Sequence, residues 1–381
     1  MLYHRLRTGF AFVPLAALGL ASTAGAQRLG PRVSATERLR LGVVDGPAAL
    51  SFYQIRDARL GPEGTLVVLD GGDNVIKVFD RAGRLLRTLG RTGEGPAEFG
   101  SAWQIELSGD TLRVLDIDLR KIVTFALQDG RLLGTRRLGF SVTLHGFPVA
   151  FATRPDGSVV IAGVQGCGFP RRPSDNQWGV FVFGLDGAVT DTIERRFIHN
   201  ALPAYTTGRQ RACTVVPWPF APGPSMAFDP AGGAYRSPGD AFVIERLDRS
   251  LTRVTETIAY SAPRLTVTGA HRREFRELLD ERESSGRELR AAVEQAADSV
   301  GYPNVWPAIT ALEVAGPGVV WAQRGRPIRA TEQEWDVLDS GRHVRTVVLP
   351  AAVRVMDVRG DRIIGTVTDE LDVQYVVLFA L

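Results

Sequence analysis

The chain has 381 residues, of which 44% are apolar and 23% are charged, and its formal net charge at pH 7 is +3. This composition agrees with a folded protein that has a large core. Without the two arginines of the N-terminal segment the charge falls to +1, and such a near-neutral balance argues against nucleic acid as the partner.

The first 26 residues differ from the rest of the chain. They begin with MLYHRLR, continue with GFAFVPLAALGLA, and end with Ala24 and Ala26 before Gln27. This pattern is typical of a secretory signal with an A-x-A cleavage site, and the alternative is a retained anchor. The residue directly after the cleavage point is not a cysteine, which argues against a lipid anchor there. No later segment reaches about 18 consecutive apolar residues. We therefore expect a signal peptide at 1–26 and a mature chain at 27–381, periplasmic or secreted, without a membrane span.

An apolar run followed by a second run, which usually ends at a tight Asp/Gly turn, recurs six times along the mature chain. The pairs are 64–70 with 74–90, 110–116 with 121–139, 157–163 with 179–193, 232–238 with 241–258, 318–323 with 334–349, and 361–367 with 373–381. An antiparallel unit of about 45 residues is typical of one propeller blade. The sequence therefore predicts an all-β, six-bladed β-propeller over 27–381.

Long insertions are expected on one face of this propeller. Numbering the strands of a blade from the axis outward, the turns between the third and fourth strands are short, as in RAG at 81–83. The insertions 164–179, 197–223 and 261–309 all fall on the opposite face. Apolar spacing in 269–299 predicts two helices separated near Ser284 and Gly286, a helical hairpin that caps one mouth.

The last blade has only three strands at the C-terminus. The segment 38–44 lies just before the first blade and can add the outer strand, next to 373–381. Such pairing removes an open sheet edge and joins the two ends of the chain.

The segment GRTGEGPAEFGSAWQI at 90–105 resembles the G-x-G-P-x-E-F segment of NHL-like six-bladed propellers. The preceding LVVLDGGDNVIKVFDRAGRLLRTLG is similar to the repeat of that family, and its exported bacterial members are the most similar. The resemblance implies the propeller fold and binding of proteins or small ligands. It also leaves room for enzymatic relatives such as amidating lyases and lactonases, so fold carries over better than function.

Catalytic motifs are nearly absent from the sequence. The mature chain has four histidines, at positions 145, 199, 271 and 343, and only His145 and His199 are expected near the insertion-rich face outside the helical hairpin. Aspartates recur at the corners between second and third strands, in the pairs 70/73, 116/118 and 369/372. They could bind Ca²⁺, as in the lactonase relatives, but such residues more often cap turns by accepting backbone amides. No cofactor or metal is therefore predicted, with Ca²⁺ as the alternative.

We expect the working surface at the insertion-rich face, because binding sites concentrate in loops held by a rigid scaffold. Guanidinium groups there suit carboxylate, phosphate or sugar-acid groups, although solvated surface arginines are common in this arginine-rich chain. The candidate ligand-binding residues are Tyr53, Asp70, Gln104, Asp118, Arg120, Arg171, Arg172 and Arg324.

The leading hypothesis is an exported propeller that binds a small ligand or a protein partner without catalysis. The alternative is a metal-dependent, lactonase-like hydrolase or lyase with an axial metal. A structural role in an envelope complex is the third possibility. The sequence does not decide between them.

Cys167 and Cys213 are the only cysteines, and they fall in neighbouring insertions of a chain expected outside the cytoplasm. We predict a disulfide between them, with two unlinked buried thiols as the alternative. Closing this loop of about 45 residues should stabilise the fold by on the order of 4 kcal/mol. Mass spectrometry without reduction should find a linked pair of peptides, and two freely alkylated thiols would rule the bond out.

Overall fold

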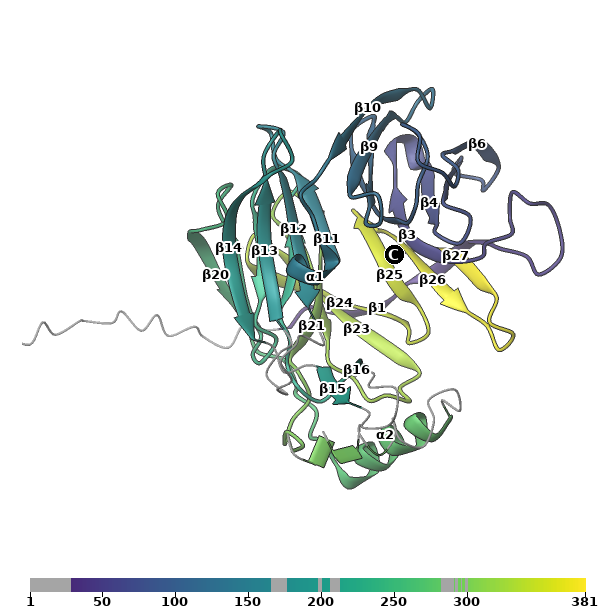
Figure 1. The fold of residues 1–381 in the computed structure, drawn as a ribbon. Coiled ribbons are helices and arrows are strands. Elements are labelled where there is room, and N and C mark those ends of the chain that lie inside the picture. The colour runs from purple at the N-terminus through teal and green to yellow at the C-terminus, as the bar shows by residue number, and fades with distance from the viewer. Residues whose placement is uncertain are drawn as a thin grey trace, which may run out of the picture.

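The computed structural model describes residues 29–165, 177–197, 201–205, 213–281 and 301–381, together with 291, 294–295 and 297–298. Nearly all of its regular structure is strand, and six antiparallel sheets follow one another along the chain. They form the blades of a six-bladed β-propeller, as the repeats predict (Figure 1).

Each blade contains four strands, and the first strand of each blade lies innermost. Blade one is β3 (Ile55–Leu60), β4 (Leu66–Asp70), β5 (Val75–Phe79) and β6 (Leu85–Leu89). Blade two is β7 (Ala102–Ser108), β8 (Thr111–Asp116), β9 (Lys121–Ala126) and β10 (Leu132–Arg137). Blade three is β11 (Phe147–Thr153), β12 (Val159–Gln165), β13 (Gln177–Phe183) and β14 (Val189–Phe197).

The second half of the ring repeats this order. Blade four is β17 (Ser225–Phe228), β18 (Ala234–Ser237), β19 (Val243–Leu247) and β20 (Val254–Ala259). Blade five is β21 (Ile309–Gly316), β22 (Val319–Arg324), β23 (Glu332–Asp339) and β24 (Arg342–Pro350). Blade six is β25 (Arg354–Arg359), β26 (Arg362–Thr368), β27 (Gln374–Ala380) and, from the N-terminus, β2 (Thr36–Leu41).

The N-terminal segment closes the ring, as predicted. β2 pairs antiparallel with β27, with Leu41 opposite Val376, although the strand covers 36–41 rather than 38–44. It ends where Gly42 adopts a φ of 140°, a conformation that favours glycine. A further strand that the sequence did not predict, β1 (Arg32–Ser34), adds in parallel to the outer strand β24 of blade five.

Apolar residues of adjacent blades form the core between their faces. Blades one and two share a cluster that includes Ile76, Phe99, Ile105 and Phe125. Such burial of alternate strand residues is what the apolar runs of the repeats predict.

The expected helical region packs on loops of blades four and five. Only its first helix, α2 (Gly269–Glu281), is described as a continuous segment, and 291, 294–295 and 297–298 are also helical. Phe275 of α2 packs against Trp218 and Phe220, at ring distances of 5.1 and 5.7 Å. Glu277 pairs with Arg329 of the loop between β22 and β23 at 3.2 Å. The helix therefore lies at the insertion-rich face.

Three short elements lie outside the blades. A short helix, α1 (Val142–His145), precedes β11, a single 3₁₀ turn at Pro62–Gly64 joins β3 to β4, and a hairpin of β15 (Ala201–Tyr205) and β16 (Cys213–Pro217) lies in the insertion after blade three. Within the described residues, no helix is long and apolar enough to span a membrane. The predicted signal segment 1–26 and the residues Cys167, Arg171, Arg172 and His199 lie outside the described residues.

Deleting residues 27–41 should destabilise the protein, because it exposes the edge of β27 and unties the ends of the ring. The loss should be several kcal/mol, on the scale of a domain's total stability. Thermal and urea unfolding of the truncated and full-length mature proteins would measure it. Equal melting temperatures would contradict the closure role of β2.

Candidate functional site

The inner strands of the six blades can be compared residue by residue. We identify equivalent positions from the pairing of each inner strand with the second strand of its blade. Five of the six inner strands carry a β-bulge near their start, so the positions must be compared after it. The pairs are Arg59 with Val67, Glu106 with Arg113, Ala152 with Val160, Ala227 with Tyr235, Glu313 with Trp321, and Arg359 with Arg362. We call the first members the ring residues.

All six ring residues line one cavity of about 710 Å³, which we call the axial cavity. It is also lined by the turns 154–157 and 229–233, which join the first and second strands of blades three and four. Blades three and four carry alanine at the ring position, whereas the other four blades carry arginine or glutamate. The small side chains leave space on this side of the axis.

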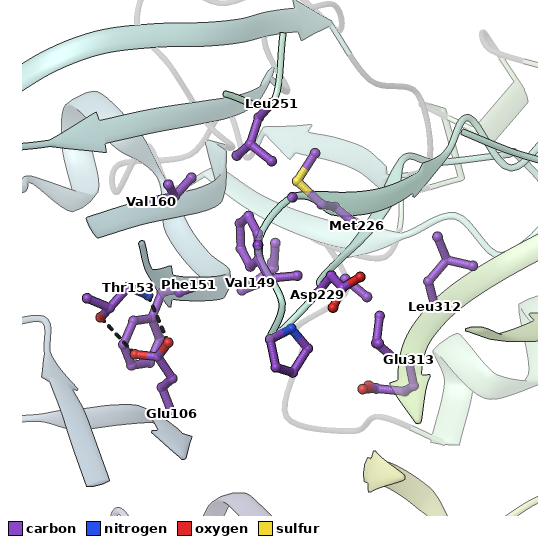
Figure 2. A pocket seen from close by; sticks show the side chains of 18 of the residues that line it. Glu106, Val149, Phe151, Thr153, Val160, Met226, Asp229, Leu251, Leu312 and Glu313 are labelled. Carbon is purple, nitrogen blue, oxygen red and sulfur yellow. Dashed lines mark hydrogen bonds between the residues drawn. The ribbon is translucent and has the colours of Figure 1, made fainter. Parts of the chain in front are cut away.

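The cavity extends from the axis between blades three and four. Apolar side chains of these two blades form what we call the apolar lobe: Val160, Val164, Trp178, Met226, Phe228 and Leu251. Figure 2 shows Val160, Met226 and Leu251 on one side of the cavity, and the carboxyl groups of Glu106 and Glu313 on the other. The cavity is therefore apolar on one side and charged on the other.

Carboxylates connect the inner strands of neighbouring blades. Asp357 of blade six accepts the amide of Leu60 at 2.8 Å, and Asp57 of blade one accepts the amide of Ile105 at 3.0 Å. Glu106 of blade two accepts both the amide and the hydroxyl of Thr153, each at 2.8 Å. These bonds satisfy buried amides that no sheet ladder reaches.

Arg59 lies among three of the carboxylates close to the axis. Its guanidinium donates to Asp57 at 3.0 Å and to the carbonyl of Met356 at 3.0 Å. Burial alone would lower the pKa of Arg59, but the negative charges of Asp57 and Asp357, and that of Glu313 when it is ionised, raise it above its ordinary value. Arg59 therefore stays charged.

Glu313, in contrast to Arg59, is held in its neutral form. Burial raises the pKa of Glu313 to about 8, Arg59 opposes this rise, and the neighbouring carboxylates of Asp357 and Asp57 add to it. The pKa of Asp357 is also raised, first by burial. Because burial penalises a further negative charge beside Asp357 and Asp57, Glu313 keeps its proton at neutral pH.

Several buried polar atoms on residues that line the cavity have no hydrogen-bond partner. They are Arg59 Nε, Arg154 Nε, Trp178 Nε1, Ser225 Oγ and Asp229 Oδ2. Leaving a buried donor or acceptor without a partner costs about 1–3 kcal/mol.

The corner aspartates cap turns, as expected. Buried Asp70 accepts the amides of Tyr53 and Gln54 and lies 3.4 Å from Lys77 Nζ. Asp116 accepts the amides of Gly100, Ser101, Asp118 and Leu119, and Asp369 accepts those of Leu371 and Val373. Their carboxylates are thus already used by the backbone.

The other predicted ligand-binding residues lie apart from the axial cavity. Tyr53, Asp118 and Arg120 are exposed, and Gln104 donates to the carbonyl of Val149 at 2.9 Å. Arg324 forms ion pairs with Asp336 and Glu334. None of these residues lines the cavity, and Arg171 and Arg172 fall outside the described residues. Ligand binding by this group stays a prediction.

The three described histidines have structural contacts. His145 lies against Phe140, Phe181 and Phe183, and His271 accepts the indole N–H of Trp306 at 3.2 Å. His343 Nε2 lies 2.8 Å from Asp336 Oδ1. No group of three or more potential metal ligands comes together in the part of the chain that the structure describes.

The sequence reasoning missed the ring residues, although a signal was present. The inner strands read IRDARL, AWQIELS, ITALEVAG and RVMDVR, with charged residues inside otherwise apolar runs. A charged residue within a buried strand is rarely found without an oppositely charged partner or a functional role. The β-bulges shift the alternation of inward- and outward-facing residues by one, so the common position of the ring residues cannot be read from the sequence alone.

Replacing Arg324 by Ala should destabilise the protein by about 3–5 kcal/mol, because it leaves the buried Asp336 without its guanidinium partner. Although burial would raise the pKa of Asp336, hydrogen bonds from His343 and Arg324 lower it. The ion pair therefore stabilises the fold at pH values above the ordinary pKa of a carboxyl group. This stabilisation is lost as the pH falls through the lowered pKa of Asp336. The variant should be closest to wild type in acid.

Urea unfolding at several pH values would measure the effect, with Arg120→Ala as the control. Arg120 is exposed, so its replacement should change the free energy of unfolding little. Equal stability of both variants at neutral pH would contradict the structural role of Arg324.

Comparison with known proteins supports the fold. The family described as 6-bladed beta-propeller, DUF5128, matches residues 59–152. A member of the DUF4221 family from Bacteroides vulgatus has a TM-score of 0.50 at 9% identity, over 91% of this chain and 97% of that one. None of the curated proteins matches the chain.

Two further solved structures are similar to this chain at lower scores. Virginiamycin B lyase from Staphylococcus aureus has a TM-score of 0.42 at 12% identity, over 90% of this chain and 98% of that one. A calcium-binding protein, regucalcin, from Agrobacterium tumefaciens has a TM-score of 0.43 at 12% identity, over 92% and 97%. The six-bladed fold is supported by the family match, and at these identities the solved structures assign no activity.

Proposed function

We propose that this exported propeller binds a small molecule in the axial cavity. The volume of about 710 Å³ is the observation that carries the proposal, because ligand pockets typically have about 300–1,000 Å³. An apolar lobe beside a few charged groups is the usual composition of such sites. The proposed export rests on the N-terminal signal pattern.

The proposed ligand spans the axis and the apolar lobe. Its apolar part would contact Trp178, Met226 and Leu251, and its polar part would face the ring residues. This moves the proposed site away from the loop residues expected from the sequence, because those residues are exposed or engaged in turns and ion pairs. The turns of blades three and four would provide the entrance.

Binding without catalysis is the simpler function for this cavity. Its charged ring residues Arg59, Glu106 and Arg359 each lie within 4 Å of an oppositely charged partner. Among the described lining residues there is no histidine and no cysteine. The metal-dependent hydrolase or lyase remains the alternative, and it would need metal ligands that the described residues do not bring together.

Filling the cavity should block binding. Ala152 is partly exposed and lines the cavity between blades three and four, so Ala152→Leu places a larger side chain in this space. With the uncharged fluorescent probe N-phenylnaphthylamine, we expect the variant to bind at least about tenfold more weakly than wild type, a loss of about 1.4 kcal/mol.

Ala82→Leu is the matched control, since Ala82 is exposed in the turn between β5 and β6. This variant should bind the probe as wild type does, and both variants should melt close to the wild-type temperature. Failure of wild type to bind the probe, or equal binding by Ala152→Leu, would overturn the proposal.

A further inference from the structure

We infer that the ligand is a monoanion with an apolar body, and that its charged group lies beside Arg59 and Glu313 on the axis. This inference rests on the proposed function and names the chemical class of the ligand. Two independent observations support it: the pairing of charges in the cavity wall, and the surroundings of Glu313.

The first observation is an excess of guanidinium groups in the cavity wall. Three of its four carboxylates have a guanidinium within 4 Å: Glu106 with Arg113 at 3.4 Å, Asp357 with Arg359 at 3.5 Å, and Asp229 with Arg246 at 3.7 Å. Arg154 and Arg249 line the same cavity, and neither has a carboxylate within 4 Å in the described part of the chain. The cavity therefore favours a negative charge on its ligand.

The second observation is the environment of Glu313 on β21. From β3 it faces Arg59 and Asp57, and from β25 it faces Asp357, which is paired with Arg359. The residue opposite on β22 is Trp321, which does not titrate. On the blade-four side, β17 has no titratable residue, Asp229 follows it, and Arg236 of β18 is paired with Glu194 and Glu245.

Glu313 is therefore the one lining carboxyl without a guanidinium within 4 Å among the described residues. With its pKa raised to about 8 by burial, it carries a proton at neutral pH and can donate that O–H to an anion. Once deprotonated, it would repel the same anion. Binding of the anion is thus linked to the proton on Glu313.

The test uses decanoate and decanol as competitors of N-phenylnaphthylamine between pH 6 and pH 10. They share an apolar chain, and only decanoate carries a charge, which it keeps across this range. Above a pKa of about 8, wild type should lose on the order of tenfold in decanoate affinity per pH unit. Decanol affinity should not depend on pH.

Glu313→Gln keeps a neutral hydrogen-bond donor at this position, so the variant should bind decanoate with the same affinity at every pH. Glu370→Gln, at an exposed glutamate, is the control and should keep the wild-type pH profile. Thermal melts at each pH would show that all three proteins are folded.

The outcomes separate the two proposals. If decanol displaces the probe and decanoate does not, or if decanoate affinity is the same across the range in wild type, the ligand class is wrong and the cavity is still a binding site. If the probe itself does not bind wild type, the proposed function fails. A decanoate profile in Glu313→Gln that matches wild type would overturn the role of Glu313.

Discussion

Buried amides at the junctions between blades are the constraint on which the centre of this propeller depends. Each sheet ends at its inner strand, so neighbouring inner strands share no backbone ladder. Their buried N–H groups still need acceptors. Asp357, Asp57 and Glu106 supply them across three successive junctions, from blade six to blade three.

These carboxylates bring charge to a place that would otherwise be apolar. Arg59 balances part of it, and its own pKa rises in response. Glu313 adds a further carboxyl that the cluster holds protonated, since burial penalises another charge. The structural solution for the blade junctions therefore creates the polar end of the axial cavity.

The position of the cavity follows from one residue per blade. Alanine at 152 and 227 leaves space between blades three and four, where the other blades place arginine or glutamate. The apolar lobe then lies beside the charged cluster. An amphiphilic anion fits this arrangement better than a purely apolar or a purely polar molecule.

The architecture was predictable from the sequence because it depends on local patterns. Alternating apolar runs and Asp/Gly turns predicted the six blades, and the missing strand of the last blade predicted the pairing of β2 with β27, which is confirmed. The aspartate corners were correctly interpreted as turn caps. The six-bladed fold, but not the NHL-like family assignment, is supported by the comparisons.

The site was harder to predict because it depends on register across the ring. The bulges in the inner strands hide which residues share a level. Asp57 is two residues from Arg59, but the carbonyl of Met356, which also accepts from Arg59, is 297 residues away in sequence. Arg324 has the same surface-loop context as Arg120 in the sequence, yet only the structure shows its pairing with Asp336. Side-chain contacts between strands decided both cases.

Crystallographic screening of small apolar acids and neutral fragments against the mature protein tests the central claim most directly. The account predicts that fragments bind in the axial cavity, with apolar parts near Met226 and Leu251 and acid groups near Arg59 and Glu313. Fragments that bind only at the opposite face, near Tyr53 and Arg120, with the axial cavity left empty, would contradict it.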